Sequence, residues 1–184
     1  LTFNEINMIL HLPFMGAGLV FAEGENREQA KYLAAHNELV ASAWATKIAH
    51  EIDPDVKVGC MLAAGSYYPY SCNPADVREA QLKNQENYFF VDVQARGHYP
   101  AYALRKFERE GIDVGMTAED EKILAENTVD FVSFSYYSSR CTAAEPPADA
   151  EMTGNAFRGV KNPYLQASQW GWAIDPLGLR ITMN

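Results

Sequence analysis

The sequence predicts an α/β protein in which helices flank parallel strands. Residues 56–64 and 130–137 are two short, largely apolar runs, and such runs are typical of strands buried on both faces of a parallel sheet. The residues between them carry helix-start signals and apolar side chains at helical spacing. A strand, a set of helices and a further strand, in that order, predict a β/α arrangement whose helices cover the sheet.

Residues 2–7, Thr-Phe-Asn-Glu-Ile-Asn, place one carboxylate between two amides. The short alternation of apolar and polar residues fits the end of a strand. Polar clusters at strand ends often form the site in parallel β/α proteins. Glu5 is therefore a candidate for acid or base chemistry, and the plain alternative is a strand that runs into a polar turn.

Residues 8–24 follow as a largely apolar stretch. We expect a loop here, because Pro13, Gly16 and Gly18 interrupt any regular element. A signal peptide or membrane span is not indicated. His11 and Pro13 interrupt the run, its flank is acidic, and its apolar part is shorter than the ~20 residues that a spanning helix needs.

A long helix is predicted to begin after Asn26, a good N-cap with Gln29 in the capping-box position, and to end at Asp53-Pro54. His36 lies on or beside the apolar stripe of this helix. A buried, hydrogen-bonded histidine is a far commoner role at such a place than a metal ligand. The residues expected to pack against a core are Ala30, Leu33, Ala34, Val40, Ala41, Trp44, Ala45, Ile48 and Ile52.

Three more helices are predicted further along the chain. Pro74 suits a first helical position, and its helix should run toward residue 88. Another covers 101–110. Thr117 and Asp120 form a capping box that starts a helix reaching to about residue 127.

Two segments are predicted to be loops. Residues 67–70, Tyr-Tyr-Pro-Tyr, form an aromatic loop whose rings could stack on a sugar or simply pack on their neighbours. Residues 140–161 are rich in Ala, Glu, Pro, Asp and Gly, which predicts a flexible surface loop that is either functional or poorly ordered.

The second strand candidate changes character at its C-terminal end, where it becomes polar and aromatic. Chemistry in parallel β/α proteins is carried by strand ends, so Ser135, Tyr136 and Tyr137 are site candidates by position. The alternative is a strand end that is merely capped by hydroxyl groups, and the residues alone leave both open.

Composition narrows the possible partners. Fifteen basic and twenty-four acidic residues give a net charge of −9, which argues against nucleic acid and anionic membranes as partners. Cys60, Cys72 and Cys141 form no CxxC pair, and their odd number favours a reducing, cytoplasmic compartment. The four histidines are too dispersed for a metal site, no nucleotide-binding glycine motif occurs, and no cofactor is expected.

Three segments, 2–7, 130–139 and 170–180, resemble glycoside hydrolase family 1 and occur in that family's order. The first resembles its Thr-x-Asn-Glu acid/base motif, and the second its strand-six motif, usually Asn-Tyr-Tyr. Ser135 stands at the Asn position, as it tends to in the 6-phospho-β-glucosidases of the family. Residues 34–43 and 162–165 are also similar to that subgroup.

The resemblance implies a (β/α)₈ barrel and retaining hydrolysis of a β-linked 6-phosphoglucoside, in which two carboxyl groups stand ~5–5.5 Å apart. It gives Glu5 the role of general acid/base, so this carboxyl must carry a proton when it acts as the acid. Asn4 matches the residue that hydrogen-bonds the sugar 2-hydroxyl, and Ser135 lies among the substrate-binding positions. Tyr137 matches the tyrosine that orients the nucleophile.

The sequence departs from the family in lacking the nucleophile, which belongs to a Glu-Asn-Gly motif on strand seven that does not occur here. The Ser, Lys and Tyr that hold the 6-phosphate after strand eight also have no match. The chain starts with Leu1 rather than Met and is expected to run from the end of strand four to just before strand seven. Residues 1–184 would then be the central part of one barrel domain, inactive alone and prone to self-association through exposed edges.

Two alternative functions stay open. One is a family 1 glycosidase for unphosphorylated β-glycosides, against which Ser135 speaks mildly. The other is a non-catalytic sugar-binding or regulatory module, for which Glu5 beside Asn4 would be unnecessary. The aromatic residues that could serve such a module as stacking platforms are Tyr67, Tyr68, Tyr70, Trp170 and Trp172.

Overall fold

The computed structural model describes residues 1–148, 150–153, 157 and 159–184. The chain forms two compact units, and each is described by itself. The first unit comprises Leu1–Ala63 and Tyr88–Ser135, and the second comprises Ala64–Asn87 and Tyr136–Asn184.

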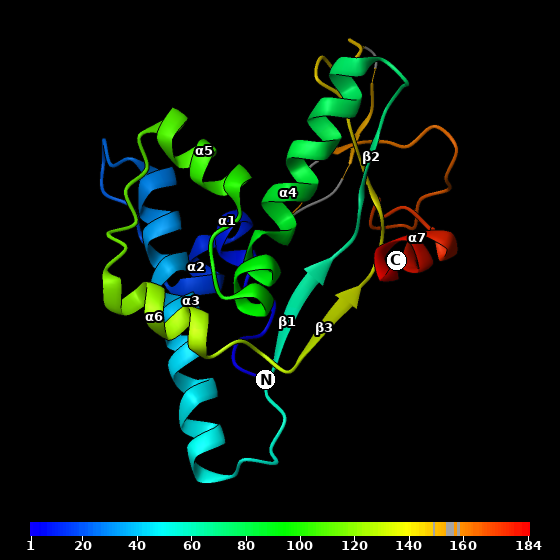
Figure 1. The fold of residues 1–184 in the computed structure, drawn as a ribbon. Coiled ribbons are helices and arrows are strands. Elements are labelled where there is room, and N and C mark those ends of the chain that lie inside the picture. The colour runs from blue at the N-terminus through cyan, green and yellow to red at the C-terminus, as the bar shows by residue number, and fades with distance from the viewer. Residues whose placement is uncertain (149, 154–156, 158) are drawn as a thin grey trace. The chain divides into compact units, whose positions relative to one another are not determined.

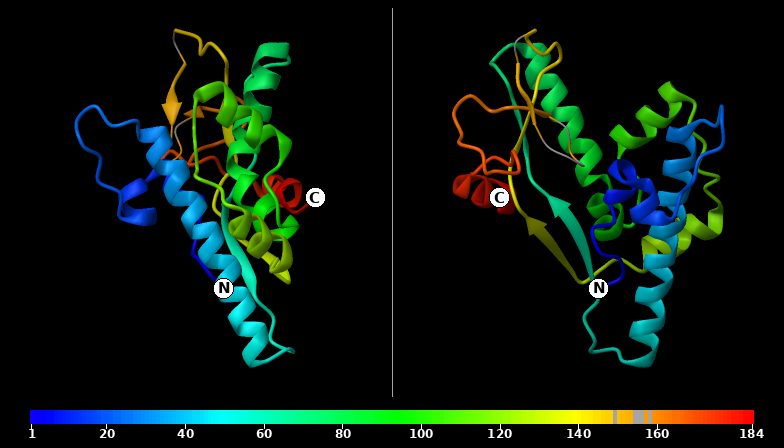
Figure 2. Two further views of the ribbon diagram at one scale, coloured as in Figure 1. Left: turned by 60° about the vertical axis from the view of Figure 1, so that its left-hand side comes forward. Right: turned by 180° about the vertical axis from the view of Figure 1, so that it is seen from behind.

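The two predicted strands are present and pair with each other. β1 (Gly59–Ala64) and β3 (Phe131–Tyr136) form a two-stranded sheet, and their arrows run side by side in the same direction in Figure 1 and in the right-hand view of Figure 2. The pairing is therefore parallel, as the apolar runs predicted. β1 begins at Gly59, three residues after the predicted start at residue 56.

Asp130 fixes the start of this strand pair. Its backbone N–H donates to the Val58 carbonyl at 2.7 Å, and its Oδ2 accepts from the Val58 N–H at 2.8 Å. His50, near the end of the preceding helix, is hydrogen-bonded to the same oxygen at 2.9 Å. The Val58 N–H and then His50 lower the pKa of the Asp130 carboxyl, which is therefore ionised at neutral pH.

The long predicted helix is α3 (Arg27–Ile52). Asn26 caps it, because its Oδ1 accepts from the Gln29 N–H at 3.2 Å. Gln29 does not complete the expected capping box. Its side chain instead bonds the backbone of Asp113 in both directions, which fastens the helix start to a distant loop.

The other predicted helices are confirmed, with one longer than expected. α5 (Ala101–Glu110) has the predicted bounds, and α6 (Ala118–Glu126) begins at the predicted Thr117–Asp120 capping box. α4 (Pro74–Arg96) runs past residue 88. Its additional turns continue because they carry Phe89, Phe90 and Val93, whose buried side chains belong to the core.

Aromatic side chains dominate the core of the first unit. Phe89 meets Tyr32, Tyr99 and Phe107 in edge-to-face contacts with centroids 5.2–6.0 Å apart, a geometry that adds to the gain from burial. The predicted buried role of His36 is confirmed. Its Nδ1 is hydrogen-bonded to the Tyr99 hydroxyl at 2.9 Å, and its Nε2 lies 3.5 Å from a carboxyl oxygen of Asp120.

The predicted core stripe of α3 is wrong for most of its larger members. Leu33, Trp44, Ile48 and Ile52 are 41%, 39%, 50% and 80% exposed. The helix is apolar on more than one face, so periodicity alone could not choose which face is buried. The buried face consists of Tyr32, Ala35, His36, Leu39, Ser42, Ala43 and Thr46.

Residues 8–24 are not the uniform loop that was expected. They contain two short helices, α1 (Met8–His11) and α2 (Pro13–Ala17). Pro13 opens α2 because its missing N–H is not needed at a first helical position. Gly18, with φ 67°, ends it in the left-handed conformation.

The side chains of β3 are less buried than predicted. Phe131 and Val132 are 43% and 47% exposed. β3 is bonded only to β1 in this sheet of the described chain, so one of its edges is not covered by a neighbouring strand. Burial on both faces requires layers on each side.

The second unit contains the remaining strands and α7 (Pro176–Met183). β2 (Tyr67–Pro69) pairs in parallel with β4 (Arg140–Thr142), so the predicted aromatic loop is largely a strand. β5 (Met152–Thr153) and β6 (Gly159–Val160) pair in antiparallel fashion. The predicted flexible loop at 140–161 thus carries three short strands, and its residues 149, 154–156 and 158 lie outside the described residues.

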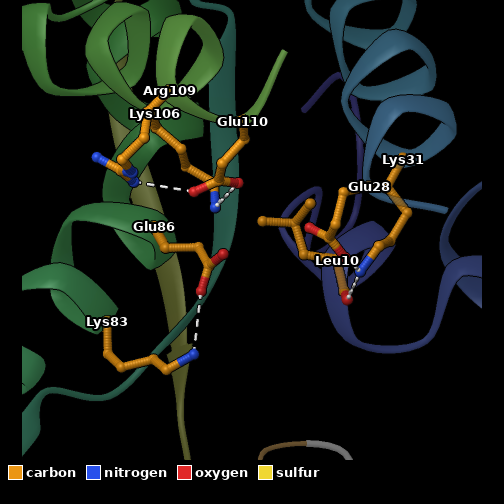
Figure 3. A network of polar contacts seen from close by, with 8 residues as sticks. All are labelled: Leu10, Glu28, Lys31, Lys83, Glu86, Lys106, Arg109 and Glu110. Carbon is orange, nitrogen blue, oxygen red and sulfur yellow. Dashed lines mark hydrogen bonds and ion pairs between the residues drawn. The ribbon is translucent and has the colours of Figure 1, made fainter. Parts of the chain in front are cut away.

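Surface ion pairs are mostly local. Lys106 and Glu110 are 2.8 Å apart and Lys83 and Glu86 are 3.5 Å apart, each within one helix (Figure 3). Pairs of this kind that solvent can reach stabilise a fold by about 0–1 kcal/mol. Lys31 also donates to the Leu10 carbonyl at 3.3 Å and so links α3 to α1 (Figure 3).

Within the described part of the chain, no helix is long and apolar enough to cross a membrane.

The exposed face of α3 gives a testable prediction about self-association. Two chains that bury Trp44 and Ile48 against each other would each remove apolar surface from water. We expect the 184-residue polypeptide, prepared alone, to associate at micromolar concentration. Trp44→Gln combined with Ile48→Lys should raise the dissociation constant about tenfold or more.

Sedimentation velocity over a concentration series measures this change. Leu104→Lys is the matched control, because Leu104 is 53% exposed on α5 and its substitution should leave association unaltered. Equal behaviour of both variants would show that the α3 face is not the contact surface.

Candidate active site

Residues 2–7 lie along β1 without forming a strand themselves. The Thr2 N–H donates to the Gly59 carbonyl at 3.2 Å, and the Ile6 N–H donates to the Met61 carbonyl at 3.3 Å. Bends and a turn occupy residues 4–7. The expected strand end is therefore a hydrogen-bonded neighbour of β1 that turns sharply at Glu5.

Asn7 completes this contact with its side chain. It is fully buried; its Nδ2 donates to the Ala63 carbonyl at 3.0 Å and its Oδ1 accepts from the Ala63 N–H at 2.9 Å. The carboxamide thus takes the place that a neighbouring strand's backbone would fill. Because a buried amide is costly unless it is hydrogen-bonded, this pair fixes the turn to the C-terminal end of β1.

The other end of the segment is held by a small buried network. The Thr2 Oγ1 accepts from the Ser42 hydroxyl at 2.9 Å, and the Gln94 Nε2 donates to the Ser42 Oγ at 2.9 Å. Ser42 and Gln94 come from α3 and α4 and are nearly fully buried. Sequence reasoning missed both residues, although a polar residue among the small residues of a core-facing helix was a signal.

Glu5 is the only described non-glycine residue with a positive φ, 49°. Side chains with a Cβ occupy this left-handed region infrequently, and such strain is maintained only where the surroundings enforce it. The hydrogen bonds of Thr2, Ile6 and Asn7 do so here. Strained backbone conformations are found preferentially at functional sites. The positive φ of Glu5 therefore supports it as a site residue.

The carboxyl group of Glu5 meets β3. Its Oε1 accepts a hydrogen bond from the Ser135 hydroxyl, near the C-terminal end of that strand. Ser133, two residues earlier on the same face, donates to the Cys60 carbonyl at 2.8 Å and keeps β3 close to β1. A carboxyl held in one orientation and only partly buried can exchange a proton with a bound ligand.

The structure therefore brings two of the four residues to which the family resemblance gives a role, Glu5 and Ser135, into direct contact. Asn4, one residue before Glu5, is exposed, so its amide is accessible to a ligand. Tyr137 lies in the second unit, where it is 67% exposed and its ring is tilted against that of Trp172 at 5.6 Å. Among the described residues, no group of three or more His, Cys, Asp or Glu side chains is placed to hold a metal ion.

Comparisons with known proteins agree on one family. The family model described as Glycosyl hydrolase family 1 matches residues 1–184. The chain is 62% identical to 6-phospho-beta-glucosidase AscB of Escherichia coli (strain K12) and 52% identical to aryl-phospho-beta-D-glucosidase BglH of Bacillus subtilis (strain 168). All of the chain aligns in both cases, but it spans only 39% of the length of each relative.

Solved structures give the same answer. A family 1 β-glucosidase from Thermotoga maritima matches with a TM-score of 0.70 and 28% identity, over 97% of this chain and 38% of that one. The virulence factor SghA from Agrobacterium tumefaciens matches with a TM-score of 0.71 and 25% identity, over 98% and 39%. The family resemblance and the fold class inferred from the sequence, part of a (β/α)₈ barrel, are confirmed.

The backbone strain at Glu5 can be tested without any substrate. Glu5→Gly and Glu5→Ala both remove the carboxyl, but alanine keeps a Cβ whose left-handed conformation costs about 1–2 kcal/mol. We expect the glycine variant to be more stable than the alanine variant by about 1 kcal/mol in urea unfolding.

The same pair of substitutions at Glu108, an exposed position inside α5, is the matched control. Glycine should be the less stable residue there by about 1 kcal/mol. If alanine were also the more stable residue at position 5, the strain would not exist.

Proposed function

Because the chain belongs to glycosyl hydrolase family 1, we propose that it is the central part of a barrel enzyme that hydrolyses 6-phospho-β-glucosides with retention of configuration. The observation that carries the proposal is the carboxyl of Glu5, fastened by Ser135 beside the exposed Asn4 at the ends of two parallel strands. In barrel enzymes the chemistry lies at this end of the strands.

In the proposed reaction Glu5 is the general acid/base. It first protonates the leaving glycosidic oxygen and then takes a proton from the water that releases the sugar. The Ser135 hydroxyl, which donates to Oε1 of Glu5, would keep the carboxyl in one orientation through both steps. The exposed amide of Asn4 would bind the sugar 2-hydroxyl.

The attacking carboxylate belongs, in this proposal, to a part of the polypeptide outside these 184 residues. Tyr137 would hydrogen-bond and orient it. Orientation of the nucleophile matters because the reacting atoms must approach within about 3–3.5 Å along the line of attack. The segment that grips the 6-phosphate would likewise lie outside residues 1–184.

The substrate class rests on the relatives. Several curated relatives that align with the whole chain are named 6-phospho-beta-glucosidase or aryl-phospho-beta-D-glucosidase. A phosphorylated β-glucoside is therefore the proposed substrate, with no nucleic acid, membrane or cofactor as partner. A cytoplasmic location is part of the proposal, and the three free cysteines, of which Cys60 and Cys141 are buried, are compatible with a reducing compartment.

Removing the general acid should lower the rate strongly for substrates with poor leaving groups and only weakly for substrates with good ones. In the full-length polypeptide, Glu5→Gln is expected to lower kcat/KM about 10²–10⁴-fold for a 6-phospho-β-glucoside with a poor leaving group, such as an alkyl alcohol. The loss should be much smaller for a dinitrophenyl 6-phosphoglucoside, because that leaving group departs without protonation. Steady-state kinetics on both substrates measure the difference.

Glu108→Gln, on an exposed surface of α5, serves as the control and should leave both rates unaltered. The isolated 184-residue chain should turn over neither substrate, since no attacking carboxylate is supplied. Turnover by that chain which disappears in Glu5→Gln would contradict this assignment. Sugar binding without turnover by the full-length protein would instead indicate a non-catalytic module.

A further inference from the structure

Asp175, directly before α7, collects hydrogen bonds from several segments of the second unit. Its carboxyl is buried, with the residue only 9% exposed. Oδ1 accepts from the Gly178 N–H at 2.9 Å, which caps α7. Oδ2 accepts from the Tyr68 hydroxyl at 2.9 Å and from the Ser139 hydroxyl at 2.6 Å.

The backbone of the same residue takes a further bond. The Asp175 carbonyl accepts from the Tyr136 hydroxyl at 2.8 Å. Tyr136 and Ser139 lie on the two sides of Tyr137 in the chain. The segment 136–139 is therefore attached to Asp175 at both of its ends.

The charge state of the network suits this role. Burial raises the pKa of the Asp175 carboxyl, but the hydroxyls of Ser139 and Tyr68 and the N–H of Gly178 lower it further than burial raises it. Burial and the bond to Asp175 raise the pKa of Tyr68. The carboxylate is therefore ionised at neutral pH and the tyrosine stays a neutral donor, which makes both hydrogen bonds charge-assisted, and the one from Ser139 is short at 2.6 Å.

Close packing at the start of α7 also restricts the conformations open to Tyr136 and Asp175. A Cβ at Gly178 would lie 2.1 Å from the Tyr136 hydroxyl and 2.4 Å from the Asp175 Oδ2. The start of α7 thus approaches Tyr136 as closely as a residue without a side chain allows. Trp172, three residues before Asp175, supports the ring of Tyr137 at 5.6 Å.

We propose that Asp175 is a positioning residue that fixes Tyr137, through Tyr136 and Ser139, in the orientation from which its hydroxyl holds the attacking carboxylate. The inference rests on the proposed function, in which Tyr137 orients the nucleophile. Asp175 itself does not touch the substrate. Its action is to hold segment 136–139 at both of its ends.

The test uses the full-length enzyme with Asp175→Asn, Tyr137→Phe and the double variant. The amide is nearly isosteric, but it presents a donor where the carboxylate accepts from two hydroxyls. We expect Asp175→Asn to lower kcat on an aryl 6-phospho-β-glucoside about 10–100-fold, with KM altered by less than threefold, because a small misplacement affects chemistry more than binding.

Two further readouts separate positioning from simple structural support. In the Tyr137→Phe background, Asp175→Asn should lower kcat by no more than about twofold, since both substitutions remove the same interaction. The acidic limb of the kcat/KM pH profile should shift upward in both single variants, because the nucleophile loses a hydrogen bond that favours its ionised form.

Asp76→Asn is the matched control. Asp76 is a buried carboxylate of the same unit that accepts from the Ser71 hydroxyl at 2.6 Å and the Ala144 N–H at 3.0 Å. Its substitution should reduce thermal stability and leave kcat of the folded enzyme unaltered. If Asp175→Asn does not fold, Tyr136→Phe removes the bond to the Asp175 carbonyl and should show the same loss and the same coupling to Tyr137.

The outcomes distinguish this inference from the proposed function. An inactive wild-type enzyme would overturn the proposed function, and the inference with it. An active wild type whose kcat depends on Glu5, combined with an unaltered kcat in Asp175→Asn, would overturn the inference alone. Losses that multiply in the double variant would also refute it, because they would place Asp175 and Tyr137 in independent roles.

Discussion

The reciprocal pair of hydrogen bonds between the Asn7 side chain and the Ala63 backbone is the constraint on which the candidate site depends. The Asn7 carboxamide bonds the backbone groups of Ala63 that a neighbouring strand would otherwise bond. The polypeptide can therefore leave the edge of β1 and turn while these buried groups stay hydrogen-bonded. Together with the bonds of the Thr2 and Ile6 N–H groups to β1, this pair holds Glu5 in its left-handed conformation. The strain, about 1–2 kcal/mol, is comparable with the ~1–3 kcal/mol that leaving a buried polar group unsatisfied would cost, so several bonds together are enough to enforce it.

The hydrogen bonds that hold residues 2–7 against β1 stabilise the fold and also position the carboxyl of Glu5. Glu5 has an unfavourable backbone conformation, and one oxygen of its partly buried carboxyl accepts from the Ser135 hydroxyl. Natural sites often combine local strain with a rigid support, because catalytic groups must be held within a fraction of an ångström. The support here is layered. Thr2, Ser42 and Gln94 fix one end of the segment, and Asn7 fixes the other.

The fold of this chain also explains why much apolar surface is left uncovered. α3 is apolar on two sides and β3 has an edge without a neighbouring strand in its sheet of the described chain, so Trp44, Ile48 and Phe131 are partly exposed. Surfaces of this kind in a globular protein are normally covered by further layers. The chain spans 39% of the length of its relatives, and the proposed full-length barrel would provide such layers.

Local sequence determined the elements whose causes are local. The capping box at Thr117, the cap at Asn26 and the two apolar runs placed helices and strands correctly, because each signal acts within a few residues. The family motif pointed to Glu5 as the general acid/base, and that role stays a prediction. Only the tertiary structure decided which face of α3 is buried, that Asn7 pairs with Ala63, and that Glu5 meets Ser135 across 130 residues of chain. These contacts depend on what packs against each element, and that information is absent from any short window of sequence.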